Sequence, residues 1–328
     1  MAKAIGRNVS VGIARETTRS TIPASASFWL RLDDQSVQEK YDMAQQEFGV
    51  GVIEGKVGAD INKFVAEVDL KGPVTDKSIG LILYSTLGTV STAANTPQTG
   101  VYRHTFSVLQ SAQHPSVSVY IDDPAAAVDY AHGNCMVTKL ELSAALGKHL
   151  AYSLGLRGKK GITQAATPAF GTENLFRPQD ITFKHAANLA GLGAAAAIQL
   201  KAFSVAIEKN IEDDDVLGST SSADFYNKQM LITGTIEAIF QNESDFKTAA
   251  LAGTAKAIRL AAINTSATIG ASANPALTID LAKAMFTEIA VNRGLNDIIT
   301  QTLSFEGYFS QTDAASITAV LDTTQASY

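Results

Sequence analysis

The sequence contains little of several residue types on which other classes of protein depend. It has 1 cysteine, 1 tryptophan and 7% aromatic residues, and only 18% of its 328 residues are charged. The lone Cys135 allows no disulfide within the chain and no cysteine-rich metal site, so we expect a buried thiol in a reducing compartment. Aromatic side chains are too sparse to favour a carbohydrate-binding β-sandwich, which would stack sugars on exposed rings.

Long apolar segments are also missing. The first twenty residues lack the roughly 7–15-residue apolar stretch of a signal peptide. Elsewhere we find no run of about 18 apolar residues that could span a membrane, so we expect synthesis in the cytosol and no membrane segment. The formal net charge of −6 argues against tight DNA binding, because such binding needs clustered Lys and Arg to displace counterions.

Motifs that carry chemistry are absent or incomplete. Residues 191–196 imitate a dinucleotide-binding loop but precede an expected strand instead of a helix. Residues 212–215 lack the alternating ligands and central glycine of a calcium loop. The 5 histidines form no H-x-x-x-H pair, and no nucleophile stands in a hydrolase motif. We therefore expect no enzymatic activity, no cofactor and no bound metal.

An internal repeat organises the sequence. Residues 136–158 align without a gap to residues 285–307, at a constant offset of 149 (285 − 136). Shared positions include a methionine at each start and a glycine at each end. Shorter pieces follow in the same order, and we pair 28–32 with 181–184, 48–53 with 203–207, 64–70 with 230–236, and 115–119 with 275–279. Self-similarity of this kind indicates a duplicated structural unit.

Apolar and polar residues alternate through most of these pieces, as in strands with one buried face. Two short helices are expected at 76–88 and 245–253, because each segment begins at Asp and stops at Gly. The sequence thus predicts a mainly β chain with two tandem β-sandwich or barrel domains, each with one helix. Its expected parts are an N-terminal arm at 1–24, domains at 25–165 and 166–312, and a C-terminal tail at 313–328.

Six of these segments, taken in order, carry a resemblance to a known family. They are His104–Phe106, Pro115–Asp122, the hairpin that starts at Leu140–Ala145 and closes at Gly158, Phe203–Asn210, Ile232–Glu237 and Leu303–Gly307. Together they resemble the major tail tube proteins of long-tailed, siphovirus-type bacteriophages, in the two-domain form, over residues 20–312.

The resemblance implies two packed antiparallel sheets with a flanking helix, and six tube domains that close a β-barrel around a wide lumen. With two domains in each chain, we expect homotrimeric rings that stack into a tube in the virion tail, through which DNA passes. It implies the tape measure, the terminator and the tail tip as partners, and it leans toward a tail without a contractile sheath. A tail terminator or hub of the same fold is the alternative, and a β-sandwich carbohydrate-binding module a distant one.

A lumen that conducts DNA needs small polar and acidic groups, because a basic wall would hold the phosphates. The non-core faces of the hairpin strands supply such groups: Glu141, Ser143, Ser153, Thr233, Thr235, Glu237, Thr300, Thr302, Ser304 and Glu306. A plain solvent or interface face is equally consistent with this pattern, because polar alternation marks any half-exposed strand. For contacts between rings, we expect a basic arm to meet an acidic hairpin tip, with Arg7, Arg15 and Arg19 facing Glu212, Asp213, Asp214 and Asp215.

Overall fold

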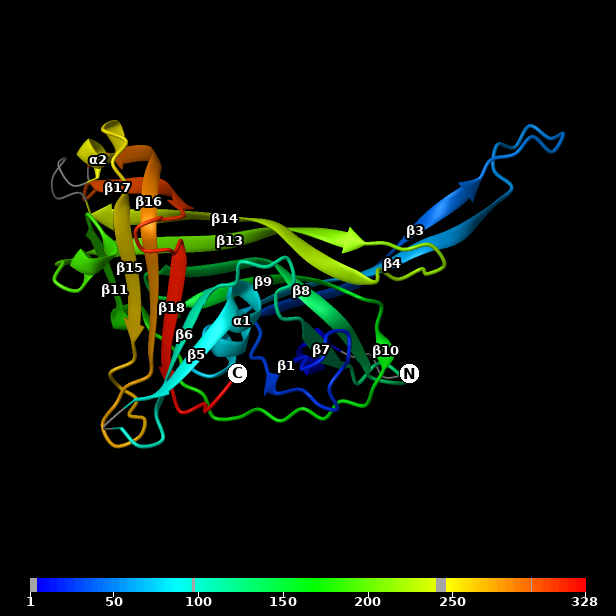
Figure 1. Ribbon diagram of the computed structural model, residues 1–328, viewed down its shortest axis with the longest axis horizontal. Coiled ribbons are helices and arrows are strands. Elements are labelled where there is room, and N and C mark those ends of the chain that lie inside the picture. The colour runs from blue at the N-terminus through cyan, green and yellow to red at the C-terminus, as the bar shows by residue number, and fades with distance from the viewer. Residues whose placement is uncertain (1–4, 96–97, 240–245, 296) are drawn as a thin grey trace.

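The computed structural model describes residues 5–95, 98–239, 246–295 and 297–328. Within these residues the chain is mainly β, as the sequence predicts, with 18 strands and two α-helices. A long hairpin, formed by strands β3 (Asp34–Gln46) and β4 (Gly58–Pro73), projects away from the rest of the molecule (Figure 1).

Eight strands form one continuous antiparallel sheet, which we call the central sheet. In spatial order they are β3, β4, β9 (Ala151–Gly158), β8 (Tyr130–Ala145), β13 (Leu200–Asp214), β14 (Asp224–Ile239), β17 (Thr300–Tyr308) and β16 (Ala276–Asn292). The sheet therefore runs without a break from the first half of the chain into the second, across the pairing of β8 with β13. Its two outermost strands are β3 and β16.

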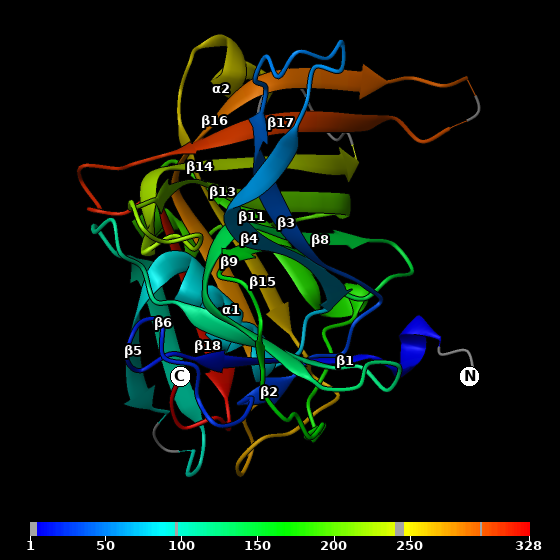
Figure 2. The ribbon, with the colours of Figure 1, turned by 90° about the vertical axis from the view of Figure 1, so that its right-hand side faces the viewer.

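The other strands form an outer layer, which is joined by strand pairing to the N-terminal parts of β8 and β16. Around β8 lie β1 (Ser10–Arg15), β2 (Phe28–Trp29), β7 (Val117–Asp122) and β10 (Ile162–Thr163). Around β16 lie β11 (Ile181–Ala186), β12 (Ala197–Ile198), β15 (Lys256–Ile263), β18 (Ile317–Thr323), β6 (Tyr102–Val108) and β5 (Gly88–Ala94). In Figures 1 and 2, β15, β16 and β18 cross the direction of β13 and β14.

Helix α1 (Ser78–Leu87) lies in the core that the two layers enclose, and all of its residues are buried. It ends at Gly88, whose φ of 101° is left-handed and favours glycine. This confirms the helix expected at 76–88. Helix α2 (Lys247–Leu251) lies inside the second expected helix, whose first residue, Asp245, is outside the described residues. Three short 3-10 turns complete the chain: η1 (Gly6–Asn8), η2 (Pro178–Asp180) and η3 (Leu189–Leu192).

The strand pairings occur twice, in the same register. Ala66 of β4 lies opposite Gly158 of β9, and Ile232 of β14 lies opposite Gly307 of β17. The two offsets are 166 (232 − 66) and 149 (307 − 158), which are the offsets of the sequence repeat. The alignment of 136–158 with 285–307, and that of 64–70 with 230–236, therefore correspond to equivalent places in the fold.

The outer layer repeats in the same way. Val117 of β7 lies opposite Cys135 of β8, and Lys256 of β15 lies opposite Ala284 of β16, each followed at once by a register shift. We call β1, β3, β4, α1, β7, β8, β9 and β10 the first repeat, and their counterparts β11, β13, β14, α2, β15, β16, β17 and β18 the second repeat.

Three of the shorter sequence correspondences were wrong. The counterpart of β13 is β3, since both have a register shift at the same point, after Asp42 and after Asn210. Residues 48–53 form no strand and lie at the tip of the β3–β4 hairpin. Likewise β1, and not residues 28–32, matches β11, while residues 275–279 lead into β16 and β15 is the counterpart of β7. Strand β3 escaped notice because it is mostly exposed and polar, so it lacks the alternation that marks a half-buried strand.

The terminal segments also contribute to the fold. Residues 1–24, expected to form an arm, contain β1, whose Val11 and Ile13 are each 1% exposed in the core. Residues 313–328, expected to form a tail, contain β18, which lies between β16 and β6. Tyr328 packs against α1 at Gly80, and its hydroxyl donates to the carbonyl of Lys77 at 2.7 Å.

Candidate assembly surface

The central sheet has one buried face and one polar face. On the buried face, Val205 and Phe305 point into the core and are 6% and 2% exposed. On the polar face, the register places Glu141 of β8, Thr233 of β14 and Glu306 of β17 in one row across the sheet. By the same register, this face carries all the other residues expected to line a lumen: Ser143, Ser153, Thr235, Glu237, Thr300, Thr302 and Ser304.

Cations on the polar face are paired with carboxylates. The Nζ of Lys139 lies 3.0 Å from Glu208 and 3.6 Å from Glu141, and its hydrogen bond to Glu208 raises the pKa of the lysine. The guanidinium of Arg157 lies 3.1 Å from Glu67 and 2.6 Å from Asp213. These pairs leave little unbalanced positive charge to attract phosphates. The face is therefore chemically suited to lie beside DNA without holding it.

Both outer strands of the central sheet have an edge without a partner strand among the described residues. In the described part of the chain, β3 pairs with β4 alone. On β16, residues 285–292 pair with β17 on one side, and no described strand pairs with their opposite side beyond the end of β15. The matching side of β8 in the first repeat is covered, because β13 pairs with residues 139–145 there. An exposed strand edge invites pairing with another chain.

The arginines expected to contact another ring lie in different settings. Arg7 is exposed in the η1 turn. Arg15 donates to the carbonyl oxygen of Tyr328 at 2.9 Å. Arg19 is held within the chain, because its guanidinium donates to Asp224 at 2.6 Å and to the carbonyl oxygen of Phe225 at 2.7 Å.

The acidic residues expected to meet them also have partners within the chain. Glu212 lies 2.7 Å from Lys228, and the hydroxyl of Tyr226 donates to Asp214 at 3.3 Å. Asp213 and Asp215 both accept from Lys63, each at 2.6 Å. The structure thus places none of the three arginines against this acidic group. Among the described residues, no group of three or more acidic, His or Cys side chains is arranged to hold a metal ion.

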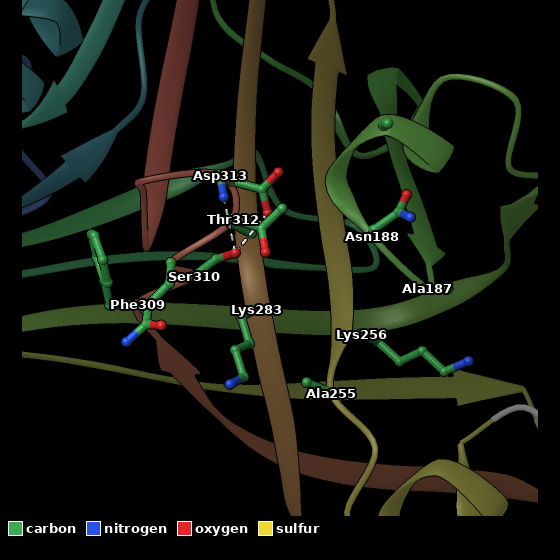
Figure 3. A pocket seen from close by; sticks show the side chains of 12 residues that line it. Ala187, Asn188, Ala255, Lys256, Lys283, Phe309, Ser310, Thr312 and Asp313 are labelled. Carbon is green, nitrogen blue, oxygen red and sulfur yellow. Dashed lines mark hydrogen bonds between the residues drawn. The ribbon is translucent and has the colours of Figure 1, made fainter.

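A hollow with a volume of about 760 Å³ opens on the outer layer of the second repeat (Figure 3). Its lining includes Lys256 of β15 and Lys283 of β16, and the turn after β17. Within that turn the hydroxyl of Ser310 donates to Asp313 at 2.7 Å, while the two lysines extend away from this pair. The hollow thus carries two lysines on its β15–β16 side and the carboxylate of Asp313 in the turn after β17, with several alanines between them.

Comparison with known proteins decides the family. The family model of the phage tail tube protein matches residues 6–307, nearly the whole chain. This chain belongs to the phage tail tube protein family. It is therefore a structural component of a phage virion tail. No curated protein matches it.

The described part of this tail tube protein contains no helix long and apolar enough to cross a membrane.

Sequence reasoning identified the polar face of the sheet but missed its edges. The edge residues of greatest interest, Lys40 on β3 and Glu288 on β16, belong to no motif, and Lys40 stands in a polar stretch. The repeat could have located β3, because subtracting the offset of 168 (207 − 39) from the residue numbers of β13 gives a segment that covers β3.

Proposed function

We propose that the chain assembles as a homotrimeric ring with pseudo-sixfold symmetry, and that such rings stack into the tail tube. In this proposal residues 25–165 and 166–312 are two tube domains, joined by β1 and β18 respectively. Each chain adds eight strands to a closed barrel, and closure removes the open edges of β3 and β16. Contacts along the axis then extend rings into a filament.

One observation carries this proposal: the junction inside the chain supplies a template for the junction between chains. Inside the chain, β13 pairs with β8, and Lys139 lies opposite Glu208. The counterpart of Lys139 on β16 is Glu288 (139 + 149), and the counterpart of Glu208 on β3 is Lys40 (208 − 168). The same register between two chains thus brings Glu288 opposite Lys40 of the next chain.

In this pair between chains the charges are again opposite, but their places are exchanged: the glutamate is on β16, the counterpart of β8, and the lysine is on β3, the counterpart of β13. The neighbouring positions also match, since Val291 falls opposite Val37 of the next chain by the same offsets. Opposite charges and paired β-branched residues directly across a strand pair each contribute about 0.2–1 kcal/mol. Because the two edges are complementary in this register, head-to-tail closure of the ring is favoured.

The polar face of the central sheet then surrounds the lumen, with Glu141, Thr233, Thr235, Glu237 and Glu306 among the residues exposed to passing DNA. Its function is passive conduction and requires no catalysis. DNA carries one negative charge per roughly 1.7 Å of its axis, so a wall with paired cations and excess carboxylates repels it weakly. During assembly in the host cytoplasm, the same lumen holds the tape measure protein. Terminator and tail tip cover the two ends.

For stacking between rings, Arg7 and Glu212 are the strongest of the residues expected from the sequence. The side chain of Glu212 is 57% exposed despite its contact with Lys228. Arg15, Arg19, Asp213, Asp214 and Asp215 take part chiefly in contacts within the chain. Their role in stacking is indirect, because these side chains are held by partners within the chain.

Electron microscopy of the purified protein tests the proposal. We expect rings and tubes in negative stain, and a ring mass of three times the chain mass of 34.6 kDa by native mass spectrometry. Single rings that do not stack into tubes would indicate the alternative, a terminator of the same fold. A protein that stays monomeric at high concentration would refute both.

A further inference from the structure

The β13–β14 hairpin is seated on the first repeat through the start of β14. The carboxylate of Asp224 accepts from Arg19 at 2.6 Å, from Asn134 at 3.0 Å and from Gln113 at 2.8 Å. Next to it, Phe225 is only 1% exposed. The hairpin of the second repeat is therefore held in a binding site on the first repeat of the same chain, which we call the seat.

The corresponding segment of the β3–β4 hairpin has no such seat. By the offset of 166, Asp224 corresponds to Gly58, and the segment 224–227 corresponds to 58–61. All four residues of 58–61 are exposed. Equivalent positions of the two repeats are thus buried or half-buried in the β13–β14 hairpin and exposed to solvent in the β3–β4 hairpin.

The seat itself has a counterpart in the second repeat. Asn134 of β8 corresponds to Lys283 of β16 (134 + 149), and Val117 of β7 corresponds to Lys256 of β15 (117 + 139). Both lysines line the hollow in Figure 3. Glu16, which accepts from the backbone N–H of Asn134 at 2.6 Å, corresponds by the pairing of β1 and β11 to Asn188, which also lines the hollow.

We infer that this hollow is a docking site for a second copy of the chain, and that residues 58–61 of the next chain's β3–β4 hairpin fill it. The inference rests on the proposed ring. In the order of the central sheet, the second repeat follows the first and its hairpin reaches back onto it. In the ring, the first repeat of the next chain follows the second repeat, and its hairpin reaches back in the same way.

Size and charge of the two partners agree with this docking. Where the seat has larger side chains, Lys283 for Asn134 and Lys256 for Val117, the hairpin has smaller ones, Gly58 for Asp224 and Ala59 for Phe225. The hairpin also brings the carboxylates Glu47 and Asp60 to a hollow that carries two lysines. The docking therefore brings two carboxylates toward the two lysines, on the side of the hollow away from Asp313, which already accepts from Ser310, and it fills a space of about 760 Å³.

A cysteine pair tests the contact. Gly58→Cys combined with Lys283→Cys places thiols at the counterparts of Asp224 and Asn134, whose side chains lie 3.0 Å apart. Gly58 has no left-handed φ, and its new Cβ would meet only the flexible end of Gln46, so the substitution is tolerated. Cys135 is 0% exposed and burial raises its pKa, so it does not compete for oxidation.

After mild oxidation of assembled protein, we expect dimers and trimers on denaturing gels and no larger species, because the contact closes within one ring. The control pair Ser36→Cys with Asp69→Cys stands at directly opposite positions of β3 and β4, within the range that a disulfide spans, so it should link without a change in chain number. A second variant, Ala59→Arg, should raise the concentration needed for assembly about tenfold by bulk and like charge. The same change at exposed Ala126 should leave that concentration unchanged.

The outcomes separate this inference from the proposed function. Tubes that form normally in the cysteine variant yet give no cross-link would overturn the docking and leave the trimeric ring standing. A ladder that continues past the number of chains in one ring would also overturn it, because the hairpin would then reach a neighbouring ring. Absence of rings from the unaltered protein would refute the proposed function together with the docking.

Discussion

Lys139 and Glu208 lie opposite each other where the two repeats of the chain meet, with 3.0 Å between the lysine Nζ and a glutamate oxygen. The pair joins β8 to β13 on the polar face of the central sheet. Because the fold is duplicated, the two residues of this pair have counterparts elsewhere in the chain. Its counterparts, Glu288 and Lys40, lie at the two open edges of the same sheet.

The first prediction concerns those edges. Lys40→Glu should weaken ring closure about three- to tenfold, since it sets two carboxylates opposite each other in place of an ion pair. The effect is measured by light scattering, as the protein concentration at which assembly begins. Adding Glu288→Lys to the same chain restores opposite charges and should restore assembly. Equal defects in the single and double variants would argue against the proposed register.

The second prediction concerns the lumen. Thr235→Lys with Thr302→Lys places unpaired cations on the polar face, which should slow DNA ejection and make its rate depend more steeply on salt. Ejection from assembled phage can be followed by the fluorescence of a DNA-binding dye. The matched control is Ala126→Lys on the exposed turn between β7 and β8. Unchanged ejection from the double lysine variant would count against a lumenal position for this face.

The third prediction concerns Lys209, which is buried against the carbonyl oxygen of Ser85 and the ring of His114. Burial lowers the pKa of Lys209 to about 7. A lysine whose folded pKa lies below its unfolded value opposes folding when charged, so stability should rise from pH 7 toward pH 10. Lys209→Met should raise the free energy of unfolding at pH 7 by about 1–3 kcal/mol and flatten that rise. Urea titrations at several pH values measure both, and an undiminished slope in the variant would refute the assignment.

The fourth prediction concerns Arg19 and Asp224. Burial alone would raise the pKa of Asp224, but hydrogen bonds from Asn134 and Arg19 outweigh it, and the pKa lies below its usual value. The stabilisation is therefore present above about pH 4 and is lost as the pH falls through the lower, folded pKa. Arg19→Ala should cost about 2–4 kcal/mol at pH 7, because it leaves a mostly buried carboxylate short of its main partner. The difference from the parent protein should shrink at acidic pH, whereas a constant difference would point to lost packing alone.

The sequence predicted those parts of the fold that pack against the core on one face. In the strands ending at Gly158 and Gly307, every second residue is buried from Tyr152 to Leu156 and from Gln301 to Phe305. Helix α1 was equally clear, because an acidic residue and a glycine bound an apolar run. The same reasoning placed the polar residues of β14 and β17 on one face, which the strand register confirms.

Other features depend on partners far away in the sequence. Arg19 was assigned to a free arm because its partner, Asp224, stands 205 residues later and no local pattern links them. Strand β3 was missed because it is polar and mostly exposed, and among the described residues it pairs only with β4. Residues whose partners lie in another chain leave no alternation in their own sequence, so an edge can be identified only after the pairings are known.

The exchanged charges at the two kinds of junction also determine which neighbours are compatible. If the β3 edge of one chain were to displace β13 from β8 of another, Lys40 would meet Lys139 and the like charges would repel. In the same way, β13 placed against β16 would set Glu208 beside Glu288. In the proposed ring this favours alternation of first and second repeats, and a strand exchange between chains that breaks the alternation would set like charges opposite each other at each wrong junction.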